Sequence, residues 1–155
     1  MTATLRAGVV GTGHLGSLHA RKYQALSGVA LTAVADLDEA SAREAAAETD
    51  ARVFSDHRAL AEEVDLVSVV VPTGLHYEVT RDLLNAGVHV LVEKPVTTTL
   101  DEARALIDLA EQKNLVLQVG HLERFNPAVQ ALAEYGGDPL FIESHRIAPF
   151  NPRGT

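Results

Sequence analysis

The 155-residue sequence contains no cysteine and no tryptophan, and aromatic residues make up only 5% of it. Without cysteine the chain cannot form disulfides, bind zinc or iron–sulfur clusters through thiolates, or use a thiol nucleophile. This absence fits a cytoplasmic protein, and we expect no metal site. With so few aromatic rings, the chain offers few surfaces on which bases or sugars could stack.

Positive charge is also scarce, with 13 Lys and Arg against 21 Asp and Glu and a net charge of −8. An acidic chain lacks the basic surface on which nucleic-acid binding depends, so we expect no nucleic-acid partner. Long apolar runs are missing too, and the N-terminal MTATLRAGVVGTG has glycines where a signal peptide needs an unbroken apolar segment. We therefore expect no membrane partner.

Short apolar runs alternate along the chain with longer amphipathic stretches. This pattern predicts strands at residues 5–10, 29–35, 52–54, 66–71, 88–92 and 115–119. It predicts helices at residues 14–27, 38–48, 57–62, 77–86, 99–114 and 127–134. Such alternation implies right-handed crossovers, and hence an α/β fold with a doubly wound, mostly parallel sheet between two layers of helices.

Residues at several predicted helix ends are typical of helix caps. Thr99 and Glu102 match a capping box, and Gly87 follows a predicted helix as a C-terminal cap. Asn126 is expected to cap the helix that Pro127 opens. A last strand-like run covers residues 140–147 and has no obvious place in the predicted sheet.

The first predicted strand is followed by a G-x-G-x-x-G motif, formed by Gly11, Thr12, Gly13, His14, Leu15 and Gly16. After a strand and before a helix, this motif is typical of a dinucleotide phosphate loop. Gly11 permits the tight turn, Gly13 lets the backbone approach a pyrophosphate, and Gly16 lets the helix pack on the strand. The alternative is a glycine-rich turn that serves packing alone.

Asp36 ends the second predicted strand, 20 residues after Gly16. A carboxylate there accepts hydrogen bonds from an adenosine ribose and repels a 2′-phosphate, which favours NAD over NADP. No arginine follows to reverse that preference. The alternative role, a solvated acid or helix cap, suits Asp38 better.

Three further strand ends carry polar groups, at residues 71–76, 93–95 and 120–127. Ligands bind at the carboxyl ends of strands in open α/β sheets, so these segments are expected to face one crevice. With these residues in view, the chain resembles the N-terminal part of the Gfo/Idh/MocA oxidoreductase family. The resemblance rests on GTGHLG, Asp36, VVVPTGLHYE, AGVHVLVEKPVTTTLDEA and VGHLERFNP, of which the EKP tripeptide is the most specific.

The resemblance implies an NAD-dependent dehydrogenase that acts on a hydroxyl of a sugar, cyclitol or nucleotide sugar. It implies that Lys94 is the active-site lysine, which contacts the substrate hydroxyl and helps to move its proton. Glu93 would orient backbone or cofactor, and Pro72 and Thr73 would lie along the nicotinamide half. The alternative for Lys94 is a surface lysine in a turn.

The roles of four other residues are less specific. His76 is expected near the nicotinamide, with a structural hydrogen-bonding role as an equal alternative. His121 and Arg124 are expected to reach substrate or cofactor, or to form a salt-bridged joint between domains. His19 is expected to be structural.

Residues 1–122 are accordingly expected to form the dinucleotide-binding Rossmann domain, and residues 123–155 a connecting helix and the start of an antiparallel substrate domain. Only the first strand of that domain, residues 140–147, is expected here, so the chain alone should be inactive. A homo-oligomer is expected, because an unpaired apolar strand tends to associate. The alternative function is a non-catalytic NAD(P)-binding or regulatory module.

Overall fold

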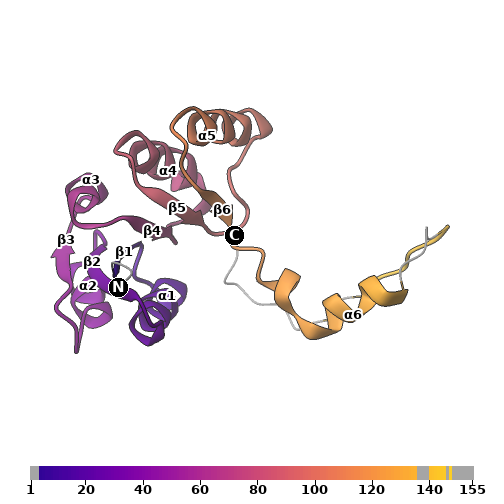
Figure 1. Cartoon of the computed structure of the whole chain (residues 1–155), viewed down its shortest axis with the longest axis horizontal. Coiled ribbons are helices and arrows are strands. Elements are labelled where there is room, and N and C mark those ends of the chain that lie inside the picture. The colour runs from indigo at the N-terminus through magenta and orange to yellow at the C-terminus, as the bar shows by residue number, and fades with distance from the viewer. Residues whose placement is uncertain (1–3, 136–139, 146, 148–155) are drawn as a thin grey trace. The chain divides into compact units, whose positions relative to one another are not determined.

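The computed structural model describes residues 4–135, 140–145 and 147 (Figure 1). The chain divides into two compact units, residues 1–121 and 122–155. The first unit contains one six-stranded sheet of order β3-β2-β1-β4-β5-β6, in which every neighbouring pair is parallel. Its strands are β1 (Leu5–Val10), β2 (Val29–Ala35), β3 (Arg52–Phe54), β4 (Leu66–Val69), β5 (His89–Val92) and β6 (Leu117–Val119). The expected doubly wound α/β fold is therefore confirmed.

Helices cover both faces of this sheet, because the strands bury side chains on both sides. On one face, Ala20 and Ala42 bring α1 (His14–Ala25) and α2 (Glu39–Ala45) against Val9. On the other face, Val10 belongs to a larger core with residues of α3 (His57–Leu60), α4 (His76–Asn85) and α5 (Leu100–Gln112). Val9 and Val10 are at most 5% exposed, which explains why residues 7–10 of β1 form a continuous apolar run.

The predicted caps are present. Thr99 and Glu102 form the capping box of α5, and the Asp38 carboxylate accepts hydrogen bonds from the backbone at the start of α2. Gly87 follows α4 with a φ of 86°, a left-handed conformation that glycine adopts without strain. In the second unit, Asn126 Oδ1 accepts the Ala128 N–H at 2.9 Å where α6 (Pro127–Tyr135) begins.

Four predicted strands differ from the structure. The strands predicted at 88–92 and 115–119 begin later, at His89 and Leu117. The run 66–71 ends as a strand at Val69, and Thr73–Leu75 form a 3₁₀ turn before α4. Residues 140–145 and 147 form no strand in the structure, and the strand predicted at 140–147 as the start of a further domain stays a prediction. A strand needs a neighbour that pairs with its backbone groups, and no described segment pairs with this run. Leu140, Phe141 and Ile142 are exposed instead.

Within the described residues, no helix combines the length and apolar character needed to cross a bilayer.

Candidate functional site

The strand order reverses between β1 and β4, which are neighbours in the sheet although β2 and β3 lie between them in sequence. At such a point the crossovers on either side diverge and leave a crevice beyond the carboxyl ends of the strands. The glycine loop follows β1, Asp36 follows β2, and residues 72–75 and 93–95 follow β4 and β5. The fold therefore brings most of the predicted site residues to one edge of the sheet.

The three glycines of the loop have different surroundings. Gly11 has a φ of 86°, and a Cβ atom there would lie 2.6 Å from the Val70 carbonyl oxygen. A Cβ atom on Gly16 would lie 1.8 Å from the Gly11 carbonyl oxygen, so close packing demands glycine at both positions. A Cβ atom on Gly13 would meet nothing within 4 Å. The space over Gly13 is therefore open to a bound group.

The N-terminus of α1 is free to bind an anion. Gly13 occupies the cap position and has no side chain to satisfy the first N–H groups of the helix. The nearby Ser17 hydroxyl donates to the carbonyl oxygens of Thr12 and Gly13 instead, at 3.0 and 3.1 Å. His14 and Leu15 are exposed on the first turn. Free N–H groups and the positive end of the helix dipole together attract phosphate.

Thr12 connects this loop to Asp36. Its backbone N–H donates to Asp36 Oδ2 at 2.6 Å, and its hydroxyl donates to the same oxygen at 3.0 Å. The Ser41 hydroxyl of α2 donates to the Thr12 carbonyl oxygen at 2.9 Å. Thr12 is only 1% exposed, so these bonds are protected from water. The loop, the end of β2 and the start of α2 are thus held together.

The Asp36 carboxylate is held in its charged form. Burial acts to raise the pKa of Asp36, but hydrogen bonds from the backbones of Thr12 and Asp38 and from the Thr12 hydroxyl outweigh it, so the pKa lies below its usual value. Asp36 Oδ1 accepts the Asp38 N–H at 2.9 Å, and the residue remains partly exposed. An anionic acceptor therefore borders the loop.

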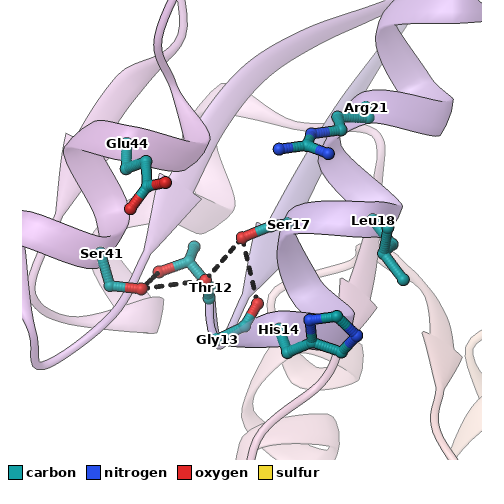
Figure 2. A pocket seen from close by; sticks show the side chains of 8 residues that line it. All are labelled: Thr12, Gly13, His14, Ser17, Leu18, Arg21, Ser41 and Glu44. Carbon is teal, nitrogen blue, oxygen red and sulfur yellow. Dashed lines mark hydrogen bonds between the residues drawn. The ribbon is translucent and has the colours of Figure 1, made fainter.

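Beside the loop lies a pocket of about 300 Å³ that is open to solvent and flanked by α1 and α2 (Figure 2). Ser17 and Ser41 point from the two helices toward Thr12, and Arg21 and Glu44 lie farther along α1 and α2. The lining is mostly polar, and both signs of charge are present. The pocket is lined by Thr12, Gly13, His14, Ser17, Leu18, Arg21, Ser41 and Glu44.

At the end of β5, Lys94 and Pro95 are exposed, whereas Glu93 is only 7% exposed. The Lys94 N–H donates to Glu93 Oε2 at 3.2 Å. A Cβ atom on Gly120, just after β6, would lie 2.7 Å from Glu93 Oε1, so the carboxylate occupies space that a larger residue would fill. Glu93 thus fixes the backbone from which the Lys94 side chain extends.

His76 lies in the interior, with 2% of its surface exposed. Its Nδ1 is 2.8 Å from the Pro95 carbonyl oxygen, and its Nε2 is 2.8 Å from the Val71 carbonyl oxygen. The ring therefore joins the turn after β4 to the turn after β5. Pro72 is exposed and Thr73 is half-buried at the same end of the sheet.

A polar cluster that the sequence did not predict lies on the α1 face of the sheet. Ser68 of β4 is fully buried, and its hydroxyl lies 2.7 Å from the Tyr23 hydroxyl and 3.0 Å from His19 Nδ1. His19 Nε2 lies 3.3 Å from Glu93 Oε1. The sequence held two signals of this cluster: Ser68 lies within a run of valines, and His19 lies one helix turn after the glycine loop.

His121 and Arg124 are both exposed, and they belong to different compact units. Neither forms an ion pair with another residue in the described part of the chain. Histidine, aspartate and glutamate do not gather anywhere in that part into a group of three that could hold a metal.

A doubly wound parallel sheet, a glycine loop with an open helix N-terminus and an acid after β2 define a dinucleotide-binding Rossmann domain. Residues 5–121 match the model of the Gfo/Idh/MocA oxidoreductase family, described as having an NAD-binding Rossmann fold. The chain belongs to this family, as the resemblance in its sequence predicted.

Two curated relatives illustrate the family. The chain is 47% identical over 150 residues to UDP-N-acetylglucosamine 3-dehydrogenase of Acidithiobacillus ferrooxidans, and the match covers 96% of the chain and 47% of the relative. It is 36% identical over 162 residues to inositol 2-dehydrogenase of Paracoccus denitrificans, covering 97% and 47%. The chain thus spans about half the length of these relatives.

Solved structures of dehydrogenases are also similar to this chain. The structure of the Acidithiobacillus ferrooxidans enzyme has a TM-score of 0.89 at 46% identity, covering 99% of this chain and 50% of that one. Scyllo-inositol dehydrogenase from Lactobacillus casei, solved with NAD(H) and scyllo-inositol, has a TM-score of 0.79 at 29% identity, covering 84% and 40%.

Proposed function

We propose that the chain is the cofactor-binding part of an NAD-dependent dehydrogenase that oxidises a hydroxyl of a sugar, cyclitol or nucleotide sugar. The observation that carries this proposal is the position of the open glycine loop, Asp36 and the Lys94 turn, which all follow the carboxyl ends of strands in one sheet. The chain is also a member of an oxidoreductase family. The 47% identity to a UDP-N-acetylglucosamine 3-dehydrogenase makes a nucleotide sugar the first substrate class to test.

The residues that we assign to the cofactor follow the edge of the sheet. The backbone of residues 11–16 would bind the pyrophosphate, and Asp36 would accept hydrogen bonds from the adenosine ribose. Pro72 and Thr73 would border the nicotinamide half, with His76 acting through these turns rather than by contact. Glu93 would act through the Lys94 backbone.

When bound, the nicotinamide supplies the acceptor for a hydride. The contribution of this chain to the chemistry is Lys94, whose Nζ we assign to the substrate hydroxyl. An ammonium group beside that oxygen stabilises the charge that develops as the hydroxyl proton leaves. Glu93 limits where Lys94 can reach, because it hydrogen-bonds the Lys94 N–H.

The proposal is tested by calorimetric titration of the chain with NADH and, separately, NADPH. NADH should bind, and NADPH should bind at least about tenfold more weakly, or 1.4 kcal/mol, because Asp36 is an anion beside the site of the 2′-phosphate. The Asp36→Asn variant should narrow this difference, since it removes the charge and keeps an acceptor. Failure of the unmodified chain to bind either nucleotide would contradict the proposal.

We also propose a cytoplasmic location and a homo-oligomer. Exposed Leu140, Phe141 and Ile142 support self-association. Light scattering coupled to size exclusion should give a mass of at least two chains, and a strictly monomeric mass would contradict the homo-oligomer.

His121 and Arg124 are assigned to substrate or to a joint between domains.

A further inference from the structure

We propose that His19 is a positioning residue that fixes the Lys94 turn through Glu93. His19 is on α1, the helix whose N-terminus lies at the glycine loop, and Glu93 directly follows β5, beside Lys94. The significance for catalysis rests on the proposed function, but the structural link itself does not. It would connect the helix that faces the phosphates to the turn that carries the lysine.

The link consists of four close contacts. The hydroxyls of Tyr23 and Ser68 are 2.7 Å apart, and Ser68 Oγ is 3.0 Å from His19 Nδ1. His19 Nε2 is 3.3 Å from Glu93 Oε1, and Glu93 Oε2 accepts the Lys94 N–H at 3.2 Å. The side chains of His19 and Glu93 are 17% and 10% exposed, so solvent screens their contact only weakly.

The positions of the protons follow from the partners. A carboxylate oxygen only accepts hydrogen bonds, so the contact with Glu93 calls for a proton on His19 Nε2. Ser68 can then donate to Nδ1 while it accepts from Tyr23, so each polar group of the series has a partner. Burial raises the pKa of Tyr23, although its hydrogen bond with Ser68 acts in the opposite direction, so the phenol keeps its proton.

Glu93 needs such a partner because its carboxylate is enclosed. Gly120 leaves room for it on the β6 side, and the Lys94 N–H occupies Oε2. Without His19, Glu93 Oε1 would lose the ring nitrogen that it contacts in a largely buried position, and the carboxylate would turn toward water. The Lys94 N–H would then lose its acceptor.

The test measures amide hydrogen exchange at Lys94 by NMR. His19→Leu should speed exchange of the Lys94 amide by at least about tenfold, equivalent to 1.4 kcal/mol, because its hydrogen bond to Glu93 is lost. His19→Gln should restore most of the protection, since the amide can donate to Glu93 and accept from Ser68. The matched control is His57→Leu, which removes a histidine–carboxylate contact of 3.2 Å to Asp82 with similar exposure.

The unmodified chain provides a measurement that needs no variant. The ¹⁵N spectrum of the His19 ring should show a proton on Nε2, the nitrogen that faces Glu93. A bare Nε2, unchanged Lys94 exchange in His19→Leu, or an equal effect of His57→Leu would overturn the inference. Titration of the unmodified chain with NADH is independent of these results, so failure of the proposed function would be seen separately.

Discussion

Thr12 is almost fully buried, yet three of its polar groups have partners: the N–H and hydroxyl with Asp36, and the carbonyl oxygen with Ser41 and Ser17. The residue occupies a variable position of the glycine motif, so the motif alone gives no reason for a threonine. Its side chain instead completes the hydrogen bonding of the acid after β2. The conformation of Asp36 therefore depends on a residue of the loop.

Thr12→Val should lower the free energy of unfolding by about 1–3 kcal/mol, because it keeps the shape of the side chain and removes a buried donor. NADH affinity should fall as well, since Asp36 loses one of the bonds that orient it. Urea denaturation and calorimetry measure the two effects.

The control for this variant is Thr98→Val. The Thr98 hydroxyl also donates to a carboxylate, Glu102 Oε2 at 2.9 Å, but at an exposed position. Its effect on the free energy of unfolding should stay within about 0.5 kcal/mol. Equal effects of the two substitutions would show that burial of the Thr12 bond contributes nothing.

Sequence reasoning could find residues whose role depends on near neighbours. Asp38, at the first residue of the predicted helix 38–48, suits a helix cap better than Asp36, and it caps α2. The contacts of His19 and Ser68 with residues of other elements could not be found this way. They depend on which strands are adjacent and on which face each side chain lies, and neither follows from local pattern.

At the scale of elements, α1 and the loop before it combine close packing with open space. Gly16 packs on the Gly11 carbonyl, whereas nothing approaches the missing Cβ of Gly13. The two glycines therefore serve different purposes, one in the fold and one in access to the helix N-terminus.

Substitution by alanine should separate these purposes. Gly13→Ala should unfold at the same denaturant concentration as the unmodified chain, because its Cβ has room, but should bind NADH at least about tenfold more weakly. Gly16→Ala should lower the free energy of unfolding by more than about 3 kcal/mol or prevent folding, because its Cβ would collide with the Gly11 carbonyl oxygen. Circular dichroism during urea denaturation and calorimetry measure the outcomes. NADH binding by Gly13→Ala at full strength would contradict the role of the open space.

The existence and order of the elements could be predicted better than their ends. β1 and β2 match the predicted runs 5–10 and 29–35, because glycine or a charged residue ends each run sharply. The valine run at 66–71 extends two residues beyond β4, because Val70 and Val71 have strand-like composition although the regular pairing of the strand ends at Val69. The run 140–147 has the composition of a strand and no partner among the described residues.

At the scale of the whole molecule, stability should depend on acid pH through carboxylates that folding keeps charged. Burial acts to raise the pKa of Asp82, but hydrogen bonds from Arg81 and His57 and the charge of Arg58 outweigh it, so its pKa is lowered. The pKa of Asp36 is lowered as well. Their stabilisation is present above the unfolded-state pKa of about 3.9 and is lost as pH falls through the lower folded-state values.

The free energy of unfolding should therefore fall steeply below about pH 4. Asp82→Asn should be less stable than the unmodified chain at pH 7, and the difference should shrink as pH falls below about 4, because both proteins then lack the charge. Urea denaturation at a series of pH values measures this convergence. A difference that stays constant from pH 7 to acid would contradict it.

The order of the strands also bears on how the chain is made. Thr12, Asp36 and Ser41 all lie before β3 ends, so the adenosine side of the site can assemble as soon as the first three strands have left the ribosome. One edge of β1 then stays unpaired until β4 emerges, more than 50 residues after β1 ends. The Lys94 side must wait longer, until β5 and β6 follow. During synthesis the nascent chain therefore passes through a stage in which one edge of β1 is unpaired. At this stage the chain is most exposed to incorrect pairing with strands of neighbouring chains.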